Sequence, residues 1–412
     1  MAATVLRART HRSRSRWAVL GTLLVAVLAL AIVLRMVNEP VPPLRIQRLL
    51  AASVPIQGPL PKLAWPAEGQ AAVEVEGIGN LGTFGPSTPA PIASVAKIMT
   101  AYLTLREYPL SPGRSGFTVT ITAAEVADER QRAARDESVL PVRAGERLSE
   151  RQALQALLLP SANNIAALLA IHDAGSTSAF LARMNATARA LGMRSTVYTD
   201  PSGYEDSTVS TAADQLRLAA AAMRVPTFAA IVDEPSAVLP VAGVLENYNG
   251  LVGHDGYVGI KTGSDSAAGG CLVFAKRVTV ASRRLLILGV VLGQRQGSLI
   301  PAALASAQRL GDSVAAALRD GVVVPAGARV LLARGVSGHP TGVVLTHALH
   351  EVGWGGLAVP VTVAIGHRPQ SLATGQQLAT VSLGAGNSGS SHAVAAATVP
   401  PPSLGWRLRH LL

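Results

Sequence analysis

A serine and a lysine three residues apart could form a nucleophile with its own base. Ser94 and Lys97 lie in the segment PIASVAKIMTAYL, whose apolar pattern is typical of a helix. Residues three apart on a helix share a face, so the lysine can reach the serine hydroxyl. A lysine desolvated in an apolar wall can be neutral enough to remove the serine proton. Only four of the 36 basic residues are lysines, so the pairing is less of an accident than in most chains.

Two further segments carry polar groups of interest. Ser161-Ala162-Asn163 lies where one predicted helix ends, at Pro160, and another begins; by itself this triplet indicates a helix cap, since Ser and Asn are favoured there. Lys261-Thr262-Gly263 lies at the end of a predicted strand and, by itself, indicates a strand that ends in a turn. Gly263 would also let a substrate backbone approach the strand edge.

The order of the three segments changes their interpretation. S-x-x-K, S-x-N and K-T-G follow one another at intervals of about 65 and 100 residues, which is the motif set of penicillin-binding proteins and class A β-lactamases. Around these motifs the chain resembles the D-alanyl-D-alanine carboxypeptidases among the low-molecular-weight penicillin-binding proteins. The resemblance covers about residues 60–310 and rests on ASVAKIMTAYL, LLLPSANNIAALLA, FLARMNATARALGMRSTVYTDPSGYEDSTVSTAADQL and GIKTGSDSAAGGCL.

The resemblance implies a catalytic mechanism of acyl transfer. Ser94 attacks the carbonyl between the two terminal D-alanines of a peptidoglycan stem peptide, with Lys97 as its base. Ser161 relays a proton to the departing D-alanine, and water then releases the acyl-enzyme. Asn163 binds the substrate backbone and helps to hold Lys97. β-Lactams inhibit such enzymes, and neither a metal nor an organic cofactor is implied.

The resemblance also implies a set of substrate-binding groups. Lys261 makes the pocket electropositive toward a carboxylate, Thr262 donates to that carboxylate, and Gly263 belongs to the same strand. The backbone N–H groups of Ser94 and Ser264 form the oxyanion hole, in which each donor is typically worth about 2.7–4 kcal/mol.

Two positions depart from the family pattern. Asn164 follows the S-x-N asparagine, where the family often has aspartate. Family members also hold the substrate carboxylate with an arginine just beyond the late strand, and the nearest candidate here is Arg295.

Two rival functions remain open. A class A β-lactamase needs a deacylating glutamate before K-T-G, and the best match is Glu246 in the sequence ENYN, which lacks the expected leucine. A membrane-anchored penicillin-binding sensor or wall-binding protein without catalysis is the other rival. The two lysines at the two motif positions that require one favour an active enzyme.

Strands and helices that must position these residues follow a clear order. Alternating residues predict strands at 72–76 and 117–121, and helical periodicity predicts helices at 98–106, 152–159, 165–171 and 179–191. Strands follow at 257–260, 272–275 and 285–292, then a helix at 300–318. Ser149 and Gln152 form a capping box at the start of the second helix. This order predicts an α+β domain of the β-lactamase/transpeptidase type, with an antiparallel sheet and a helical block.

The N-terminal region predicts export. Five arginines within residues 1–16 form a basic head, and the 18-residue apolar run from Trp17 to Leu34 rises about 27 Å as a helix, enough to span a bilayer. We interpret residues 17–37 as a retained signal-anchor in a bacterial cell membrane with the catalytic domain extracytoplasmic. The alternative is a cleaved signal peptide, for which Ala51-Ala52-Ser53 is a weak cleavage site.

The remaining organisation follows from composition. Residues 38–60 are Pro-rich and predict a linker, residues 61–318 the peptidase domain, and residues 319–412 a small β-rich domain with a flexible tail. Outside the basic head the net charge is +6 without a dense basic run, so the sequence does not predict a nucleic-acid partner. The single cysteine, Cys271, excludes an intrachain disulfide. We interpret it as a core residue, and His347, His350 and Glu351 as solvated side chains rather than a metal site.

Overall fold

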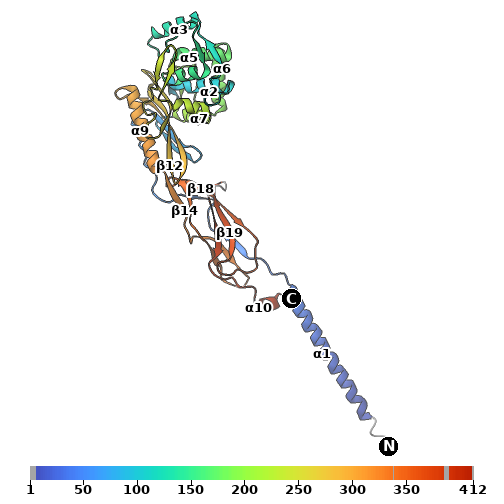
Figure 1. Cartoon of the computed structure of the whole chain (residues 1–412). Helices are drawn as coiled ribbons and strands as arrows, with labels where there is room; N and C mark the ends of the chain where they lie inside the picture. Colours follow the sequence, from blue (N-terminus) through green and yellow to red (C-terminus); the bar gives the residue numbers. More distant parts are fainter. Residues whose placement is uncertain (1–5, 337, 385–388, 411–412) are drawn as a thin grey trace. The chain divides into compact units, whose positions relative to one another are not determined.

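The computed structural model describes residues 6–336, 338–384 and 389–410, and it divides the chain into two compact units (Figure 1). The larger unit comprises Leu60–Asp320 with Val352–Trp354. The smaller unit comprises Met1–Pro59, Gly321–Glu351 and Gly355–Leu412. All three motifs of the sequence analysis lie in the larger unit.

The larger unit contains a five-stranded antiparallel sheet in the order β11-β12-β13-β3-β4. β3 (Gln70–Val75) and β4 (Gly79–Phe84) lie at the beginning of the unit. The other three strands, β11 (Tyr257–Asp265), β12 (Gly269–Val280) and β13 (Arg283–Gln294), lie near its end. Terminal segments therefore share one sheet, which confirms the predicted α+β arrangement.

Helices cover this sheet. α7 packs on β3 and β13, whereas α9 packs on β12 and β13 and lies on the side of the sheet away from the helical block (Figure 1). Because both faces are covered, β12 and β13 are long apolar runs rather than alternating ones. The helices are α2 (Lys97–Glu107), α3 (Ala123–Ala133), α4 (Glu150–Leu158), α5 (Asn163–Ala174), α6 (Thr177–Ala190), α7 (Ala212–Met223), α8 (Pro226–Val232) and α9 (Leu299–Ala317).

α2 is the central helix of the block. It contacts α4, α5, α7 and α8, and its buried residues include Ile98, Met99 and Leu103. The capping box predicted at α4 is present, with the Ser149 hydroxyl accepting from the Gln152 backbone N–H and the Gln152 side chain accepting from the Ser149 N–H. The cap fixes the start of α4, the helix that precedes the S-x-N segment.

Short strand pairs connect the loops around the helical block. β5 (Ala90–Pro91) pairs with β8 (Val209–Ser210), which joins the segment before Ser94 to a loop more than a hundred residues later. β6 (Thr118–Thr120) pairs with β7 (Arg147–Ser149), and β9 (Ser236–Leu239) pairs with β10 (Gly243–Glu246).

The smaller unit contains a seven-stranded sheet in the order β1-β15-β16-β20-β19-β18-β2. β1 (Arg45–Arg48) and β2 (Ser53–Pro55) lie within residues 38–60, which the proline content predicts to be a linker, and they pair with β15 (Arg329–Arg334) and β18 (Ala358–Ile365). Leu44 and Ile56 beside them are buried in the core of this unit. The other strands of this sheet are β16 (Thr341–Leu345), β19 (Gln377–Leu383) and β20 (Ser390–Ala395). β14 (Arg319–Val324) and β17 (Leu349–Gly353) pair with each other in a separate two-stranded sheet.

The expected flexible tail is only partly described. Residues 385–388 and 411–412 lie outside the described residues, and a short helix, α10 (Leu404–Arg409), lies between them in sequence. In the described part of the chain, no three His, Cys, Asp or Glu side chains are placed to hold a metal ion.

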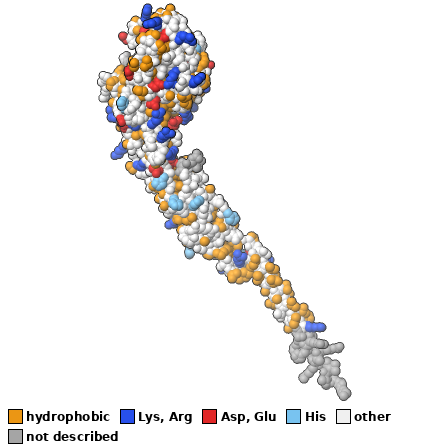
Figure 2. Space-filling model, in the orientation of Figure 1, with side chains coloured by type: hydrophobic (Ala, Val, Ile, Leu, Met, Phe, Trp, Pro, Cys, Tyr) orange, Lys and Arg blue, Asp and Glu red, His pale blue; other side chains and the backbone are white. Residues whose placement is uncertain are grey.

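α1 (Leu6–Asn38) is a continuous helix, and the part from Arg16 to Asn38 is long and apolar enough to cross a membrane, with a mean hydropathy of 2.7. Its apolar side chains are exposed, as the hydrophobic surface of this helix in Figure 2 shows. An exposed apolar helix of this length is typical of either an anchor or a signal sequence.

Candidate active site

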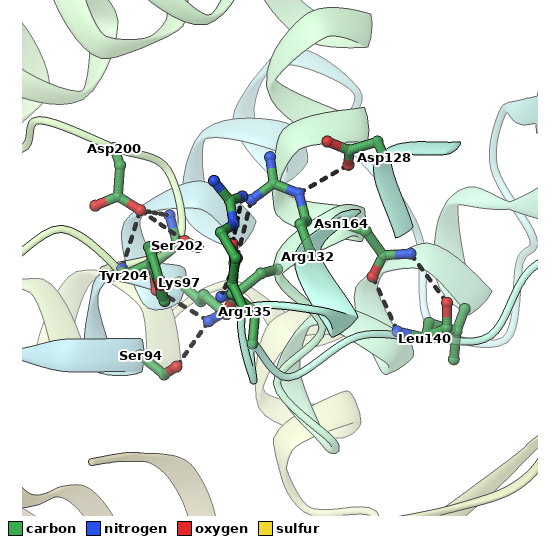
Figure 3. A network of polar contacts seen from close by, with 12 residues as sticks. Ser94, Lys97, Asp128, Arg132, Arg135, Leu140, Asn164, Asp200, Ser202 and Tyr204 are labelled. Atoms are coloured by element: carbon green, nitrogen blue, oxygen red, sulfur yellow. Dashed lines mark hydrogen bonds and ion pairs between the residues drawn. The ribbon is translucent and has the colours of Figure 1, made fainter. Parts of the chain in front are cut away.

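Ser94 and Lys97 meet as their spacing predicts. Ser94 lies in a single 3₁₀ turn, η1 (Ala93–Ala96), and α2 begins at Lys97. Lys97 Nζ donates a hydrogen bond of 2.7 Å to Ser94 Oγ (Figure 3). Ala93, just before the serine, has a left-handed φ of 44°, a strained conformation for a residue with a Cβ.

Lys97 is buried completely, with an exposed fraction of 0%. Its second acceptor is the carbonyl oxygen of Ser202, at 2.9 Å. Burial lowers the pKa of Lys97 well below its usual range, and the positive charge of Lys261 lowers that pKa further. The amine that contacts the serine oxygen can therefore be neutral and accept the serine proton.

The loop that holds Lys97 is organised by Asp200. Its carboxylate accepts from the Ser202 N–H, from the Tyr204 N–H and from the Thr208 hydroxyl, at 2.9, 3.0 and 2.7 Å. Gly203 follows in the left-handed region, and a Cβ there would lie only 1.8 Å from the carbonyl oxygen of Ala93. The Asp-Pro-Ser-Gly sequence thus packs against the Ser94 turn and directs one carbonyl to Lys97.

The S-x-N segment connects α4 and α5, as predicted, but neither polar residue caps a helix. Ala162 is the N-cap of α5 and makes no side-chain cap bond. Ser161 has a left-handed φ of 69°, and its buried hydroxyl has no hydrogen-bond partner among the described residues. Strain and an unpartnered buried hydroxyl in one residue indicate a functional position.

Asn163 does not hold Lys97, which corrects one expectation. Its Nδ2 donates instead to Glu137 Oε2 at 2.8 Å. Its Oδ1 is buried and finds no partner in the described part of the chain. The oxygen of this amide is therefore available to a donor from a ligand.

Lys261 and Thr262 are buried on β11, at the edge of the sheet. Lys261 is 1% exposed, and within the residues described its ammonium has no hydrogen-bond partner. Burial lowers the pKa of Lys261 to about 7. Gly263 makes room chiefly for the Ser94 turn, because a Cβ there would lie 2.9 Å from Ser94 N and 3.0 Å from Val95 N.

A cleft of about 640 Å³ brings the three motifs together. Ser94 and Asn163 line it from the first two motifs, and Ser264, the residue after Lys261-Thr262-Gly263, lines it beside the third. Ser161, Lys261 and Thr262 are not among the lining residues. Lys97 lies behind Ser94, hydrogen-bonded to it and 0% exposed. The other lining residues come from three loops and include several acidic ones: Ala93, Asp136, Glu137, Ser138, Gly203, Tyr204, Glu205, Asp206, Ser207, Asp265 and Ser266.

The two departures from the family pattern have structural explanations. Asn164 Oδ1 accepts from the Leu140 N–H at 2.9 Å, and Asn164 Nδ2 donates to the Leu140 carbonyl at 3.0 Å (Figure 3). An ionised aspartate could accept but not donate, so this pair of hydrogen bonds to the Leu140 backbone requires the amide.

Arg295 is not among the residues that line the cleft. Its guanidinium donates to the carbonyl oxygens of Ser266, at 2.8 Å, and Ala267. These carbonyls lie in the turn between β11 and β12, so Arg295 supports the turn that follows Lys-Thr-Gly. The structure therefore gives no support to Arg295 as the carboxylate-binding residue.

Glu246, the candidate deacylating base of the β-lactamase alternative, also lies outside the cleft lining. Glu246 is the last residue of β10 and is exposed.

Cys271 is buried on β12, in keeping with a core residue, and burial raises its pKa to about 12.

The site is that of a serine acyl-transfer enzyme: a serine contacts a buried lysine, and a second serine and a second lysine are buried without partners among the described residues. Family comparison agrees, since the model of the D-alanyl-D-alanine carboxypeptidase family matches residues 82–296. The chain belongs to this family of serine DD-peptidases.

The chain is similar to individual members of this family in both sequence and structure. It is 31% identical to a D-alanyl-D-alanine endopeptidase of Pseudomonas aeruginosa, over 60% of this chain and 78% of that protein. It is 35% identical to a D-alanyl-D-alanine carboxypeptidase of Mycobacterium tuberculosis, over 48% of this chain and 65% of that protein. A Streptomyces DD-transpeptidase superposes with a TM-score of 0.53 at 27% identity, covering 62% of this chain and 98% of that one.

Penicillin-binding protein 5 of Haemophilus influenzae shares the fold over more of the chain. Its TM-score is 0.56 at 20% identity, and the match covers 82% of this chain and 99% of that one. The match extends beyond the peptidase domain into the β-rich region, which confirms the predicted overall architecture.

Proposed function

We propose that this protein is an exported serine carboxypeptidase that removes the terminal D-alanine from peptidoglycan stem peptides and that β-lactams inhibit. The observation that carries the proposal is the contact of 2.7 Å between Ser94 Oγ and Lys97 Nζ, with Lys97 wholly buried. A buried amine can act as a base at neutral pH, and few structural roles favour placing one against a serine.

The proposed reaction has two halves. Ser94 Oγ attacks the carbonyl carbon of the penultimate D-alanine while its proton passes to Lys97. The C–N bond then breaks, the departing D-alanine takes a proton through Ser161, and an ester to Ser94 remains. Water hydrolyses this ester, which returns the serine and releases the shortened peptide.

Binding roles follow from the family motif and from two buried groups without hydrogen-bond partners among the described residues, the Lys261 ammonium and the Asn163 oxygen. Lys261 and Thr262 bind the terminal carboxylate of the substrate, and the Asn163 oxygen accepts from a substrate N–H. The backbone N–H groups of Ser94 and Ser264 form the oxyanion hole, which the presence of both residues in the lining of one cleft supports. Gly263 allows the close packing that brings β11 to the Ser94 turn.

A substrate comparison tests this function. We expect the full chain in detergent to release D-alanine from diacetyl-Lys-D-Ala-D-Ala, and to release it faster than it cleaves a D-Ala–diaminopimelate crosslink in a purified muropeptide dimer. Chromatography of both products measures the two rates. Dimer cleavage without D-alanine release would indicate an endopeptidase, the activity named for the relative from Pseudomonas. Rapid nitrocefin hydrolysis without D-alanine release would indicate a β-lactamase.

We propose further that α1 is a retained membrane anchor with the peptidase outside the cytoplasm. Cleavage after Ser53 would remove β1 and cut into β2, two strands of the smaller unit. Loss of edge strands exposes unpaired backbone groups, so retention of the segment is favoured.

The anchor has a direct test. We expect the protein expressed in bacteria to stay in the membrane fraction after alkaline carbonate extraction, and to dissolve in detergent. A chain that begins at Asn38, behind a cleavable export signal, should appear in the soluble fraction. An intact mass that lacks the first 50 or so residues would show that the segment is a signal peptide instead.

A further inference from the structure

The amide of Asn163 is held by a carboxylate that the sequence did not single out. Glu137 lies between α3 and β7, and its side chain is 0% exposed. Its Oε2 accepts from Asn163 Nδ2 at 2.8 Å. Two arginines complete its surroundings: Arg132 Nη1 donates to Oε2 at 3.0 Å, and Arg135 Nη2 donates to Oε1 at 2.6 Å.

The two arginines explain how this carboxylate can be buried. An isolated buried charge is costly, and hydrogen-bonded partners of opposite charge compensate for it. Arg132 is itself held by Asp128, which accepts from its Nε at 2.8 Å (Figure 3). Arg135 lies over the ring of Tyr204. Glu137 is therefore a fixed acceptor rather than a mobile surface group.

This fixed acceptor determines which way the Asn163 amide points. A carboxylate can only accept, so the amide must turn Nδ2 toward Glu137 and Oδ1 away from it. Asn163 lines the cleft, and its Oδ1 has no partner among the residues described. Without Glu137 the amide could rotate and present a donor where the substrate needs an acceptor.

The backbone contacts nearby do not impose this orientation. The Asn163 N–H donates to the Ser138 carbonyl at 2.7 Å, and Asn164 binds the Leu140 peptide through two hydrogen bonds. These contacts attach the loop 136–140 to the start of α5. Among the described residues, Glu137 alone hydrogen-bonds the side-chain amide of Asn163, so Glu137 determines its rotation.

We propose that Glu137, clamped by Arg132 and Arg135, is a positioning residue that presents the Asn163 oxygen to a peptide N–H of the bound stem peptide. This inference rests on the proposed peptidase function and adds a residue to it. Glu137 lines the cleft, but both of its oxygens are occupied by Arg132, Arg135 and Asn163, so in this proposal it acts on the substrate through Asn163.

The test replaces the carboxylate in the full chain. We expect Glu137→Met, which keeps the length of the side chain but cannot accept, to lower kcat/KM for D-alanine release on the order of 10- to 100-fold. Glu137→Gln should stay within about threefold of wild type, because one oxygen can still accept from both Asn163 and Arg132. Asp128→Asn is the matched control, since it removes a carboxylate from the same network without touching Asn163, and it should retain wild-type activity.

A double-variant cycle separates positioning from a general structural effect. In an Asn163→Ala background, Glu137→Met should change kcat/KM by less than about twofold, since its partner is absent. An equal loss in both backgrounds overturns the proposal, as does a Glu137→Gln protein as impaired as Glu137→Met. Wild-type activity of Glu137→Met also overturns it.

Folding and function are checked separately. Thermal unfolding of each variant shows whether it is native at the assay temperature. If Glu137→Met is not native, Glu137→Asp replaces it. The aspartate keeps the charge for the arginines but is one methylene too short to reach Asn163, so activity should again fall. Wild-type activity of Glu137→Asp would contradict the proposal. Failure of the proposed peptidase function would appear differently, as a wild-type protein that releases no D-alanine.

Discussion

We expect Ser94→Ala to abolish covalent labelling by fluorescent penicillin and to lower D-alanine release at least about a thousandfold. A β-lactam resembles the D-Ala-D-Ala end of the substrate, and its ring opens onto the serine oxygen to give a slow acyl-enzyme. Alanine removes that oxygen and leaves the cleft otherwise intact. Gel fluorescence after incubation with the probe measures the label.

Ser313→Ala is a suitable control. This serine lies on α9, its hydroxyl contacts Ala64 and Leu310, and it is not among the lining residues of the cleft. It should be labelled like wild type. Labelling that persists in Ser94→Ala, at a stoichiometry near one, would show that another residue is the nucleophile.

Lys97→Arg should lower D-alanine release about 100- to 10,000-fold, the range typical of general-base removal. Arginine keeps the positive charge but stays protonated, so it cannot accept the serine proton.

The wild-type rate should also depend on pH with a defined sign. Because the base must be neutral, kcat/KM should rise as pH rises through the lowered pKa of Lys97, and this acidic limb should be absent from the residual activity of Lys97→Arg.

Lys276→Arg controls for placing an arginine at a buried lysine. Lys276 is 6% exposed and donates to the Asp255 carbonyl and to Asp312, away from the motif residues. The Lys276→Arg variant should keep wild-type activity if it folds, which thermal unfolding checks.

Equal, background-level D-alanine release from wild type and Lys97→Arg would instead favour a penicillin-binding sensor without catalysis.

The sequence predicted the helices and strands whose own residues carry a hydrophobic pattern, because such a pattern can be recognised without knowing which elements pair with it. The helical periodicity at 152–159 and 165–171 corresponds to α4 and α5, and the apolar runs at 272–275 and 285–292 lie in β12 and β13. It missed β1 and β2, which have four and three residues in a Pro-rich segment. Strands this short have no pattern of their own, because their residues become strands through pairing with β15 and β18.

At the site, local pairs were predictable and distant ones were not. The Ser94–Lys97 contact follows from residues three apart at the start of a helix. Glu137 stands 26 residues before Asn163 and has no sequence signal, because a carboxylate just after two arginines is an ordinary surface pattern. The Ser202 carbonyl could not be predicted either, since every residue carries one and only the fold selects which one faces Lys97.

The sequence by itself determined the chemical groups, their order and the local helix that brings serine to lysine. Tertiary structure decided what those groups can do. Burial makes Lys97 able to be neutral and leaves the Ser161 hydroxyl and the Lys261 ammonium without partners among the described residues. The hydrogen bond from Asn163 Nδ2 to Glu137 turns the Asn163 oxygen away from that carboxylate. The physical reason is that a pKa and an amide orientation depend on solvent exclusion and on neighbours in space, and these neighbours come from loops far apart in the chain.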